Sequence, residues 1–392
     1  MLSSVEVNSY INNVKNRKVL FTATVVKTHI NAFHLPYLKW FKEQGYEVHV
    51  AAKNDFINEP CVIPNCDKFY DINFARFPFS KLNIKAYRQL KKIISENNYD
   101  IIHCHTPVAS VLTRLAARNC QNTTVIYTAH GFHFFKGAPL LNWLIYYPVE
   151  RICAKYTDKL ITINQEDYKR AKQFNLRQNG KVYYVLGVGI NLEKIQNVEV
   201  DIQQKKKELG IPENTPVLLS VGELIKRKNH ETVLKALSGI KDMNFVYLIC
   251  GRGILMEYLQ NLTNQLGLET KVKFLEFRKD IIEICKTADL FIFPSHQEGL
   301  PVALMEAMAC ELPIIASNVR GNRDLLDKEN LFEPNDINSL KNIIQEDLNS
   351  IHENGKHKII YKNLEKYSLN SILDKMVEIY CEAGNKKFNH KI

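Results

Sequence analysis

Two glutamates lie in an otherwise apolar stretch near the C-terminal end of the chain. The stretch is SHQEGLPVALMEAMACELPIIAS, residues 295–317, and it holds Glu298 and Glu306 with seven residues between them. Nine of the ten residues 301–310 are apolar, and their helix-forming types, with Pro301 at the first position, predict a helix. A carboxylate in a buried helix is costly unless it accepts hydrogen bonds, and no lysine or arginine lies three or four residues from Glu306.

Two explanations of Glu306 are compatible with the sequence. Hydroxyl groups of a bound sugar or ribose would donate to the carboxylate, or a distant arginine such as Arg320 or Arg323 would pair with it. The context favours a ligand, because Glu298 and Gly299 form a strand-to-helix loop, and the free N–H groups at a helix start favour a phosphate. Those N–H groups belong to Leu300, Val302 and Ala303.

A predicted strand, residues 215–222, ends in a basic loop with the sequence VGELIKRK, residues 221–228. The loop contains Gly222, Lys226, Arg227 and Lys228. Cations at the end of a strand suit an anionic ligand, and a solvated basic turn is the alternative. The segment GRG, residues 251–253, also follows a strand but lacks the third glycine of a dinucleotide fingerprint, so we interpret it as a tight turn.

Histidines follow several predicted strands of the first half of the chain. They are His29 in KTHINAF, with Asn31 beside it, then His103 and His105 in DIIHCH, His130 in AHG, and His133. We expect His29, Asn31, His105 and His133 to line a sugar or acceptor pocket, with a plain loop as the alternative for the first two. We expect no metal, because no pair among the histidines near Cys104 has zinc-site spacing, and residues 103 and 105 face away from Cys104 on a strand.

The elements that position these residues alternate between strands and helices in two consecutive runs. The first run extends from strand 18–26 to strand 181–190, and the second from strand 215–222 to strand 312–317. Such runs predict two doubly wound α/β domains whose ligands lie beyond the carboxyl ends of the strands. We expect domains at residues 1–187 and 188–370, with a C-terminal helix, 371–392, that packs back on the first.

Composition narrows the class of protein. The 392 residues are 45% hydrophobic and 24% charged, as in a globular protein of two domains. Nine scattered cysteines indicate reduced thiols. The N-terminus lacks the apolar core of a signal peptide and no apolar run could span a bilayer, so we expect a cytoplasmic or peripheral protein.

The net charge of +10 favours anionic partners. The basic residues are spread along the chain and QQKKKELG, residues 203–210, is interpreted as a solvated helix face, so we expect no nucleic acid. The aromatic segment 131–148 is predicted to place Leu141, Leu144 and Ile145 in the core. If its apolar side chains were exposed, they would suit a lipid-linked acceptor or an anionic membrane surface.

The stretch 295–317 resembles the signature of retaining glycosyltransferases of family 4, which have the GT-B fold. The resemblance continues in SVGELIKRKNHETVLKAL, in GVGINLEKI and in AHGFHFF, and covers roughly residues 18 to 380. It implies two Rossmann-like doubly wound parallel-sheet domains that face a cleft. It also implies bacterial surface polysaccharide synthesis, with an undecaprenyl-diphosphate-linked or glycan acceptor.

The resemblance assigns roles to individual residues. Glu306 would bind the nucleotide ribose, Glu298 the hydroxyls of the donor sugar, Lys228 the diphosphate, and His130 would lie beside the donor sugar. The amides of residues 300–303 would cradle the diphosphate. The family usually has an arginine directly after Gly222, and this chain has Glu223. Either Arg227 or Lys226 would supply the second charge, or Glu223 would accept a hydrogen bond from a hydroxyl of the donor.

We therefore predict a metal-independent hexosyltransferase that uses a nucleotide diphosphate donor, most simply a UDP-sugar, and needs no cofactor. The catalytic residues would be Glu298, His130 and Lys228. Two alternatives keep the same fold: a GT-B phosphorylase or epimerase, or a non-catalytic subunit that binds a nucleotide sugar. The glutamate that replaces the usual arginine supports only the last of these.

Overall fold

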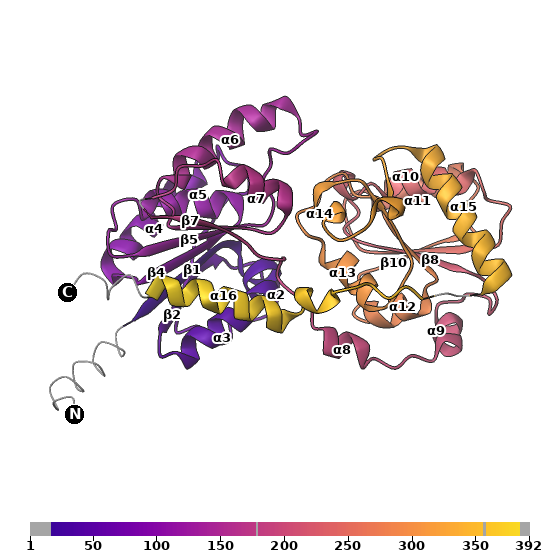
Figure 1. The fold of residues 1–392 in the computed structure, drawn as a ribbon, viewed down its shortest axis with the longest axis horizontal. Helices are drawn as coiled ribbons and strands as arrows, with labels where there is room; N and C mark the ends of the chain where they lie inside the picture. The colour runs from indigo at the N-terminus through magenta and orange to yellow at the C-terminus, as the bar shows by residue number, and fades with distance from the viewer. Residues whose placement is uncertain (1–16, 178, 356–357, 385–392) are drawn as a thin grey trace. The chain divides into compact units, whose positions relative to one another are not determined.

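A computed structural model describes residues 17–177, 179–355 and 358–384 (Figure 1). The chain divides into two compact units, residues 1–185 with 373–392, and residues 186–372. Two predictions lie outside the described residues. They are the absence of a signal peptide at the N-terminus and the last part of the predicted helix 371–392.

The N-terminal unit is built on a seven-stranded sheet in which all neighbouring strands are parallel, in the order β3-β2-β1-β4-β5-β6-β7. The strands are β1 (Lys18–Val25), β2 (Glu47–Lys53), β3 (Lys68–Asp71), β4 (Ile101–His105), β5 (Thr124–Ala129), β6 (Lys159–Thr162) and β7 (Lys181–Tyr184). The chain order reverses between β1 and β4, which is where ligands of such sheets bind.

Helices cover this sheet. They are the π-helix η1 (Val26–Ile30), α2 (Asn31–Phe33), α3 (Leu35–Glu43), α4 (Leu82–Asn97), α5 (Pro107–Ala116), α6 (Leu140–Ala154) and α7 (Gln165–Ala171). The C-terminal helix α16 (Leu369–Gly384) also packs here, because Tyr380 is buried and its hydroxyl lies 2.8 Å from His103 Nδ1. The central strands β1, β4 and β5 are buried almost throughout, because both faces of a parallel sheet are covered.

The C-terminal unit contains a six-stranded parallel sheet in the order β10-β9-β8-β11-β12-β13. The strands are β8 (Val217–Val221), β9 (Val246–Cys250), β10 (Val272–Glu276), β11 (Leu290–Phe293), β12 (Ile314–Ser317) and β13 (Leu331–Phe332). Here the order reverses between β8 and β11, so the basic loop after β8 and the glutamate loop after β11 leave neighbouring strands at this point.

The remaining helices belong to this unit. They are α8 (Leu192–Gln196), α9 (Ile202–Glu208), η2 (Lys226–Lys228), α10 (His230–Ser238), α11 (Met256–Gln265), α12 (Ile281–Thr287), α13 (Val302–Ala309), α14 (Arg320–Arg323), η3 (Lys328–Asn330), α15 (Ile337–Asn354) and η4 (Leu364–Tyr367). No helix of the described residues has the length and apolar character needed to cross a bilayer.

The predicted alternation of strands and helices in two parallel sheets is confirmed. Two strands were not predicted, β3 and β13. The edge strand β3 has the sequence KFYD, which carries a charge at each end and is only partly buried, and β13 is two residues long. Neither has the apolar run by which a buried parallel strand is recognised.

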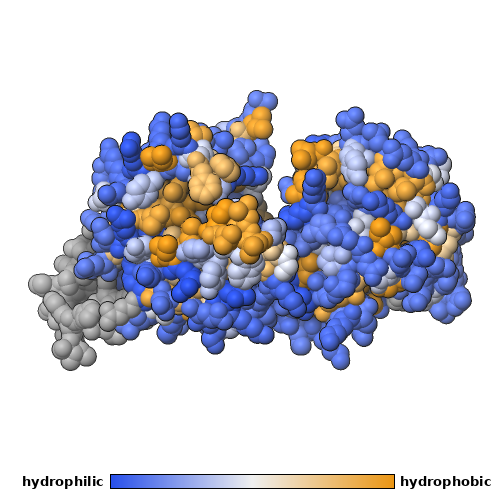
Figure 2. Space-filling model, turned by 90° about the horizontal axis from the view of Figure 1, so that it is seen from above, coloured by the Kyte–Doolittle hydropathy of each residue, from blue (hydrophilic) through white to orange (hydrophobic). Residues whose placement is uncertain are grey.

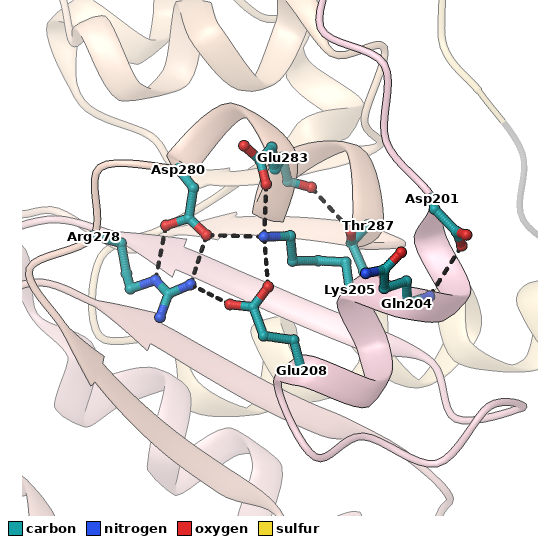
Figure 3. Close-up of polar contacts among 8 residues, drawn as sticks. All are labelled: Asp201, Gln204, Lys205, Glu208, Arg278, Asp280, Glu283 and Thr287. Atoms are coloured by element: carbon teal, nitrogen blue, oxygen red, sulfur yellow. Dashed lines mark hydrogen bonds and ion pairs between the residues drawn. The ribbon is translucent and has the colours of Figure 1, made fainter.

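The prediction of a solvated basic face at residues 203–210 is wrong for two of its lysines. Lys205 contacts Glu208 at 2.8 Å, Asp280 at 3.1 Å and Glu283 at 2.6 Å, so α9 is fixed to α12 (Figure 3). Lys206 is buried and donates to two backbone carbonyls, at 2.8 and 3.0 Å. A cationic helix face can pack in this way when acidic groups of another segment neutralise it, and those groups lie more than 70 residues away in the sequence.

Arg278 completes this network. Its guanidinium bonds both Asp280 and Glu208 (Figure 3). The hydrogen bonds from Arg278 and then from Lys205 lower the pKa of Asp280 to about 2. The carboxylate is therefore ionised at neutral pH, and its stabilising contribution is lost only as the pH falls from about 4 through 2.

Candidate active site

Glu298 is held by two cations of the basic loop. Its Oε1 lies 2.7 Å from Lys228 Nζ and 3.0 Å from Arg227 Nη1. Arg227 also donates to the backbone carbonyl of Gln297 at 3.0 Å. Glu298 is a buried carboxylate, and it is satisfied because both cations reach the same oxygen. The loops after β8 and β11 are thus connected by charge, at the point where the strand order reverses.

A glycine makes room for Lys228. A Cβ on Gly222 would lie 3.3 Å from Cδ of Lys228, so the lysine stem runs against the backbone of the strand end. The ammonium lies 4.8 Å from the centroid of the Phe293 ring, and the side chain is only 13% exposed. Lys228 is therefore fixed in direction by packing, by a cation–π contact and by an ion pair.

The GRG segment forms the tight turn expected from the sequence. A Cβ on Gly251 would lie 1.9 Å from the backbone oxygen of Gly222, and one on Gly253 would lie 2.4 Å from that of Leu224. Leu224 N–H also donates to the carbonyl of Arg252 at 2.9 Å. The turn after β9 therefore packs directly on the basic loop, and its glycines allow two backbones to approach each other.

The helix α13 begins one residue later than predicted. Pro301 is the N-cap, not the first helical residue as predicted, because its extended ψ of 123° places it outside the helix. No side chain caps this end. The loop before it is rigid, because Arg320 Nε donates to the carbonyl of Glu298 at 3.0 Å and a Cβ on Gly321 would lie 2.3 Å from the carbonyl of Gly299. Backbone N–H groups at residues 302 and 303 begin the helix and suit an anion.

Glu306 lies in the second turn of α13 and is partly buried. Burial raises the pKa of this carboxyl above its ordinary value. In the part of the chain that the structure describes, Glu306 makes no ion pair, and Arg320, one of the two arginines considered as partners, binds the Glu298 carbonyl instead. The carboxylate thus keeps acceptor capacity for a ligand.

The structure also brings four histidines together in the N-terminal unit: His29, His34, His105 and His130. Each offers a ring nitrogen, and these four atoms all lie within 4.8 Å of one another. His29 lies in η1 after β1, His34 directly before α3, His105 at the end of β4 and His130 just after β5. The cluster therefore lies at the carboxyl edge of the sheet, beside the reversal of strand order between β1 and β4.

Burial disfavours the charged form of these rings. Burial lowers the pKa of all four, to about 4 for His130, and neighbouring histidines lower that of the other three further. His34 and His105 stack with ring centroids 3.8 Å apart. The rings are packed against one another without charge.

Two residues predicted for the same pocket lie outside this cluster. Asn31 Nδ2 donates to the Val62 carbonyl at 2.8 Å, and His133 stacks on Tyr146 with centroids 4.5 Å apart. His34 was not predicted as a site residue. A signal was present, because His29 and His34 have four residues between them, which falls within the H-x3–5-H spacing of zinc ligands.

The fold and the two strand-end sites define a glycosyltransferase of the GT-B class, and comparison with known proteins identifies the family. Residues 18–164 match the family described as "Glycosyl transferase 4-like", and residues 201–366 match "Glycosyl transferases group 1". The chain therefore belongs to the group 1, or family 4-type, glycosyltransferases.

Individual relatives agree with this family. EpsD of Bacillus subtilis (strain 168), whose name calls it a glycosyltransferase, is 44% identical over 322 residues, which are 81% of this chain and 83% of that protein. An Escherichia coli UDP-Gal:α-D-GlcNAc-diphosphoundecaprenol α-1,3-galactosyltransferase is 32% identical over 76% of this chain and 80% of its own length. The crystal structure of Anabaena HepE with UDP and glucose shares the fold, with a TM-score of 0.73, 19% identity and coverage of 93% of this chain and all of that one.

Proposed function

We propose that this glycosyltransferase moves a hexose, with retention of anomeric configuration, from a UDP-sugar to a hydroxyl of a glycan or of an undecaprenyl-diphosphate-linked sugar. The observation that carries the proposal is the convergence of Lys228 and Arg227 on Glu298 beside the N-terminus of α13. The basic loop and the start of α13 together offer a diphosphate two cations and the positive end of a helix.

The donor contacts follow from this arrangement. As the glycosidic bond breaks, negative charge grows on the leaving diphosphate, and Lys228, Arg227 and the amides of residues 300–303 stabilise it. No metal ion is required for that charge. Arg227 takes the place of the arginine that Glu223 replaces, since it reaches Glu298 directly. Glu306 accepts hydrogen bonds from the ribose, and Glu298 accepts them from the sugar while it orients the two cations.

Retention is proposed to occur by front-face displacement. The acceptor oxygen attacks the anomeric carbon from the side on which the phosphate leaves, and the leaving phosphate oxygen takes the acceptor proton. The protein then supplies charge stabilisation and positioning, not a covalent nucleophile. The acceptor is assigned to the N-terminal unit, where a ring N–H of His130 would donate to a sugar hydroxyl.

The relatives support the substrate classes. The E. coli relative carries a UDP-sugar and a diphosphoundecaprenol acceptor in its name, and a second relative from Campylobacter jejuni also names a diphospho-undecaprenol acceptor. These names concern those proteins, and their acceptor chemistry is a proposal for this chain. It places the reaction in surface polysaccharide synthesis at the inner face of a membrane.

Turnover with a donor panel tests this function. Purified protein would be incubated with UDP-, GDP- and TDP-sugars and with a membrane lipid extract. We expect consumption of one UDP-sugar that depends on the extract, with a product that carries the new sugar in the α configuration. If calorimetry shows that UDP binds but no donor is consumed with any acceptor, the chain is a non-catalytic binding subunit. Conversion of the donor sugar without an acceptor would indicate an epimerase.

The apolar face of α6 supports a membrane surface as a partner. Leu140 is 73% exposed, Leu141 63% and Leu144 65%, so the prediction that Leu141 and Leu144 belong to the core is wrong. Ile145 is only partly buried, and α6 contacts the core of this region through Trp143, Tyr146 and Tyr147, which pack against a cluster that includes residues 132 and 134. Figure 2 shows apolar side chains gathered on a face of the N-terminal unit. Arg151 and Lys155, exposed at the end of α6, would face anionic headgroups.

We expect the double variant Leu141→Ser/Leu144→Ser to lose most binding to vesicles that contain anionic lipid, because about 0.8 kcal/mol is lost per CH2 no longer buried in the bilayer. Vesicle flotation at low and high salt would measure the bound fraction. The control is Ile254→Ser, which removes an even more exposed apolar side chain from the C-terminal unit. Equal binding of both variants and the wild type would show that α6 does not dock on the membrane.

A further inference from the structure

We propose that His29, His34, His105 and His130 form a zinc site in the N-terminal unit. The site goes beyond the proposed transfer reaction, because it uses no residue that binds the donor diphosphate. The four ligands come from three segments: the turn after β1, the end of β4 and the residue after β5.

The geometry of the nitrogens fits a tetrahedral metal. His105 Nδ1 and His130 Nε2 are 3.3 Å apart, and one nitrogen from each of the four rings lies within 4.8 Å of the other three. Zinc–imidazole bonds are about 2.0–2.1 Å long, so two ligands of a tetrahedral zinc are about 3.3 Å apart. One edge of the tetrahedron is therefore already present, and the other nitrogens need shifts of about 1.5 Å or less.

The hydrogen bonding of the cluster is incomplete. Both ring nitrogens of His34, which is 1% exposed, and the Nε2 atoms of His29 and His105 are buried without a hydrogen-bond partner among the described residues. A buried polar atom without a partner costs about 1–3 kcal/mol, so an absent ligand is indicated at His29 and His34. A metal takes one nitrogen of each imidazole, so with His105 bound through Nδ1 it would supply a partner to His29 and His34 but not to His105 Nε2.

Other buried histidines of the same unit differ. His103 has Tyr380 Oη at 2.8 Å from one nitrogen and Thr128 Oγ1 at 2.8 Å from the other. His49 likewise has Tyr99 Oη and a Glu47 carboxylate oxygen, each at 2.7 Å. His103 and His49 thus have a partner for each ring nitrogen, whereas His34 has none for either.

The chemistry of the donor set selects the ligand. Unprotonated imidazole nitrogens offer lone pairs, and a set of four suits zinc and related divalent ions of the first transition row. A phosphate or carboxylate would need protonated rings, and the described residues place no acid in the cluster to stabilise them. A cation that binds nitrogen is therefore favoured over an anion.

A metal here would fix the segment after β1. His29 lies in η1, a π-helix, and such helices are rare and concentrate at functional sites. Coordination would fasten η1 and the start of α3 to the ends of β4 and β5. A bond through Nε2 of His130 leaves its Nδ1–H as a donor, so the same ring can hold a sugar hydroxyl in the direction that the metal sets.

The experiment uses full-length protein without a polyhistidine tag, stripped of metal by a chelator, and titrated with Zn2+ alone against a chromogenic competitor. We expect one equivalent to bind, and Co2+ to give the intense visible absorption of a tetrahedral site. His34→Asn should weaken binding by more than the 10–100-fold that loss of an outer-shell partner costs. The control His133→Asn removes an imidazole outside the cluster and should bind as the wild type does.

Absence of stoichiometric binding by wild-type protein, or an octahedral Co2+ spectrum, would overturn the site. Equal affinity of His34→Asn and His133→Asn would also overturn it. If His34→Asn does not fold, His29→Asn replaces it, because His29 is partly exposed. The Co2+ spectrum of the wild-type protein tests the site independently of any variant. The readout needs neither donor nor acceptor, so its failure is distinct from failure of the proposed transferase activity.

Discussion

Lys228→Ala is expected to lower turnover by about a hundredfold or more, because removal of one preorganised transition-state contact costs about 10²–10³ in kcat. Lys228 is the most enclosed cation of the basic loop, with a side chain 13% exposed and fixed against Gly222 and Phe293. Its ammonium cannot easily be replaced by water or by a neighbouring side chain. Initial rates with saturating donor would measure the loss.

Two variants of the same loop serve as controls for Lys228→Ala. Lys226 is exposed and no described contact joins it to Glu298, so Lys226→Ala should keep nearly full turnover. Arg227 is 38% exposed and shares Glu298 with Lys228, so Arg227→Ala should lie between the two. A fully active Lys228→Ala, together with an inactive Arg227→Ala, would transfer the main charge contact to the arginine.

Glu306→Ala is expected to weaken UDP binding about 10- to 100-fold, because hydrogen bonds to a charged group each contribute about 1.5–3 kcal/mol. Isothermal titration calorimetry with UDP would measure the affinity. Glu257→Ala, which removes an exposed glutamate from α11 of the same unit, should leave the affinity unchanged. Unchanged affinity of Glu306→Ala would show that Glu306 does not bind the nucleotide.

Stability distinguishes a ligand-binding Glu306 from a structural one. Burial raises the pKa of Glu306 in the folded protein, so the protonated form is favoured by folding, and that contribution is lost as the pH rises through the folded pKa. The ionised form of Glu306 therefore opposes folding. Glu306→Gln should consequently unfold at the same or a higher temperature than the wild type, while it binds UDP more weakly.

Local sequence carried most of what was predicted of the C-terminal unit. Glu298, Glu306 and the start of α13 lie within nine residues of one another, so the sequence alone places them on one helix and the loop before it. Lys228 was recognised because it matches the lysine of the family motif in the basic loop after a strand. The ion pairs that place Lys228 and Arg227 on Glu298 were not predicted, since they join residues about 70 positions apart.

Exposure was harder to predict than secondary structure. The sequence of α6 predicts a helix, and one exists, but it does not say which side lacks a covering element. Leu141 and Leu144 are apolar in either case. The helix packs on Phe134 through Trp143 and Tyr147, and the two leucines stay exposed. The lysines of α9 show the reverse error, because distant acids cover a face that looks solvated.

The amino-acid sequence by itself determined the family, the alternation that builds two parallel sheets, and the glutamate and lysine motifs, because each of these depends on residues close together in the chain. Only the tertiary structure decided the histidine cluster. His29 and His34 are separated from His105 and His130 by 71 or more positions, and no helical or strand period relates them. They meet because β1, β4 and β5 are neighbours whose carboxyl ends share one edge of the sheet, and long-range strand pairing sets that adjacency.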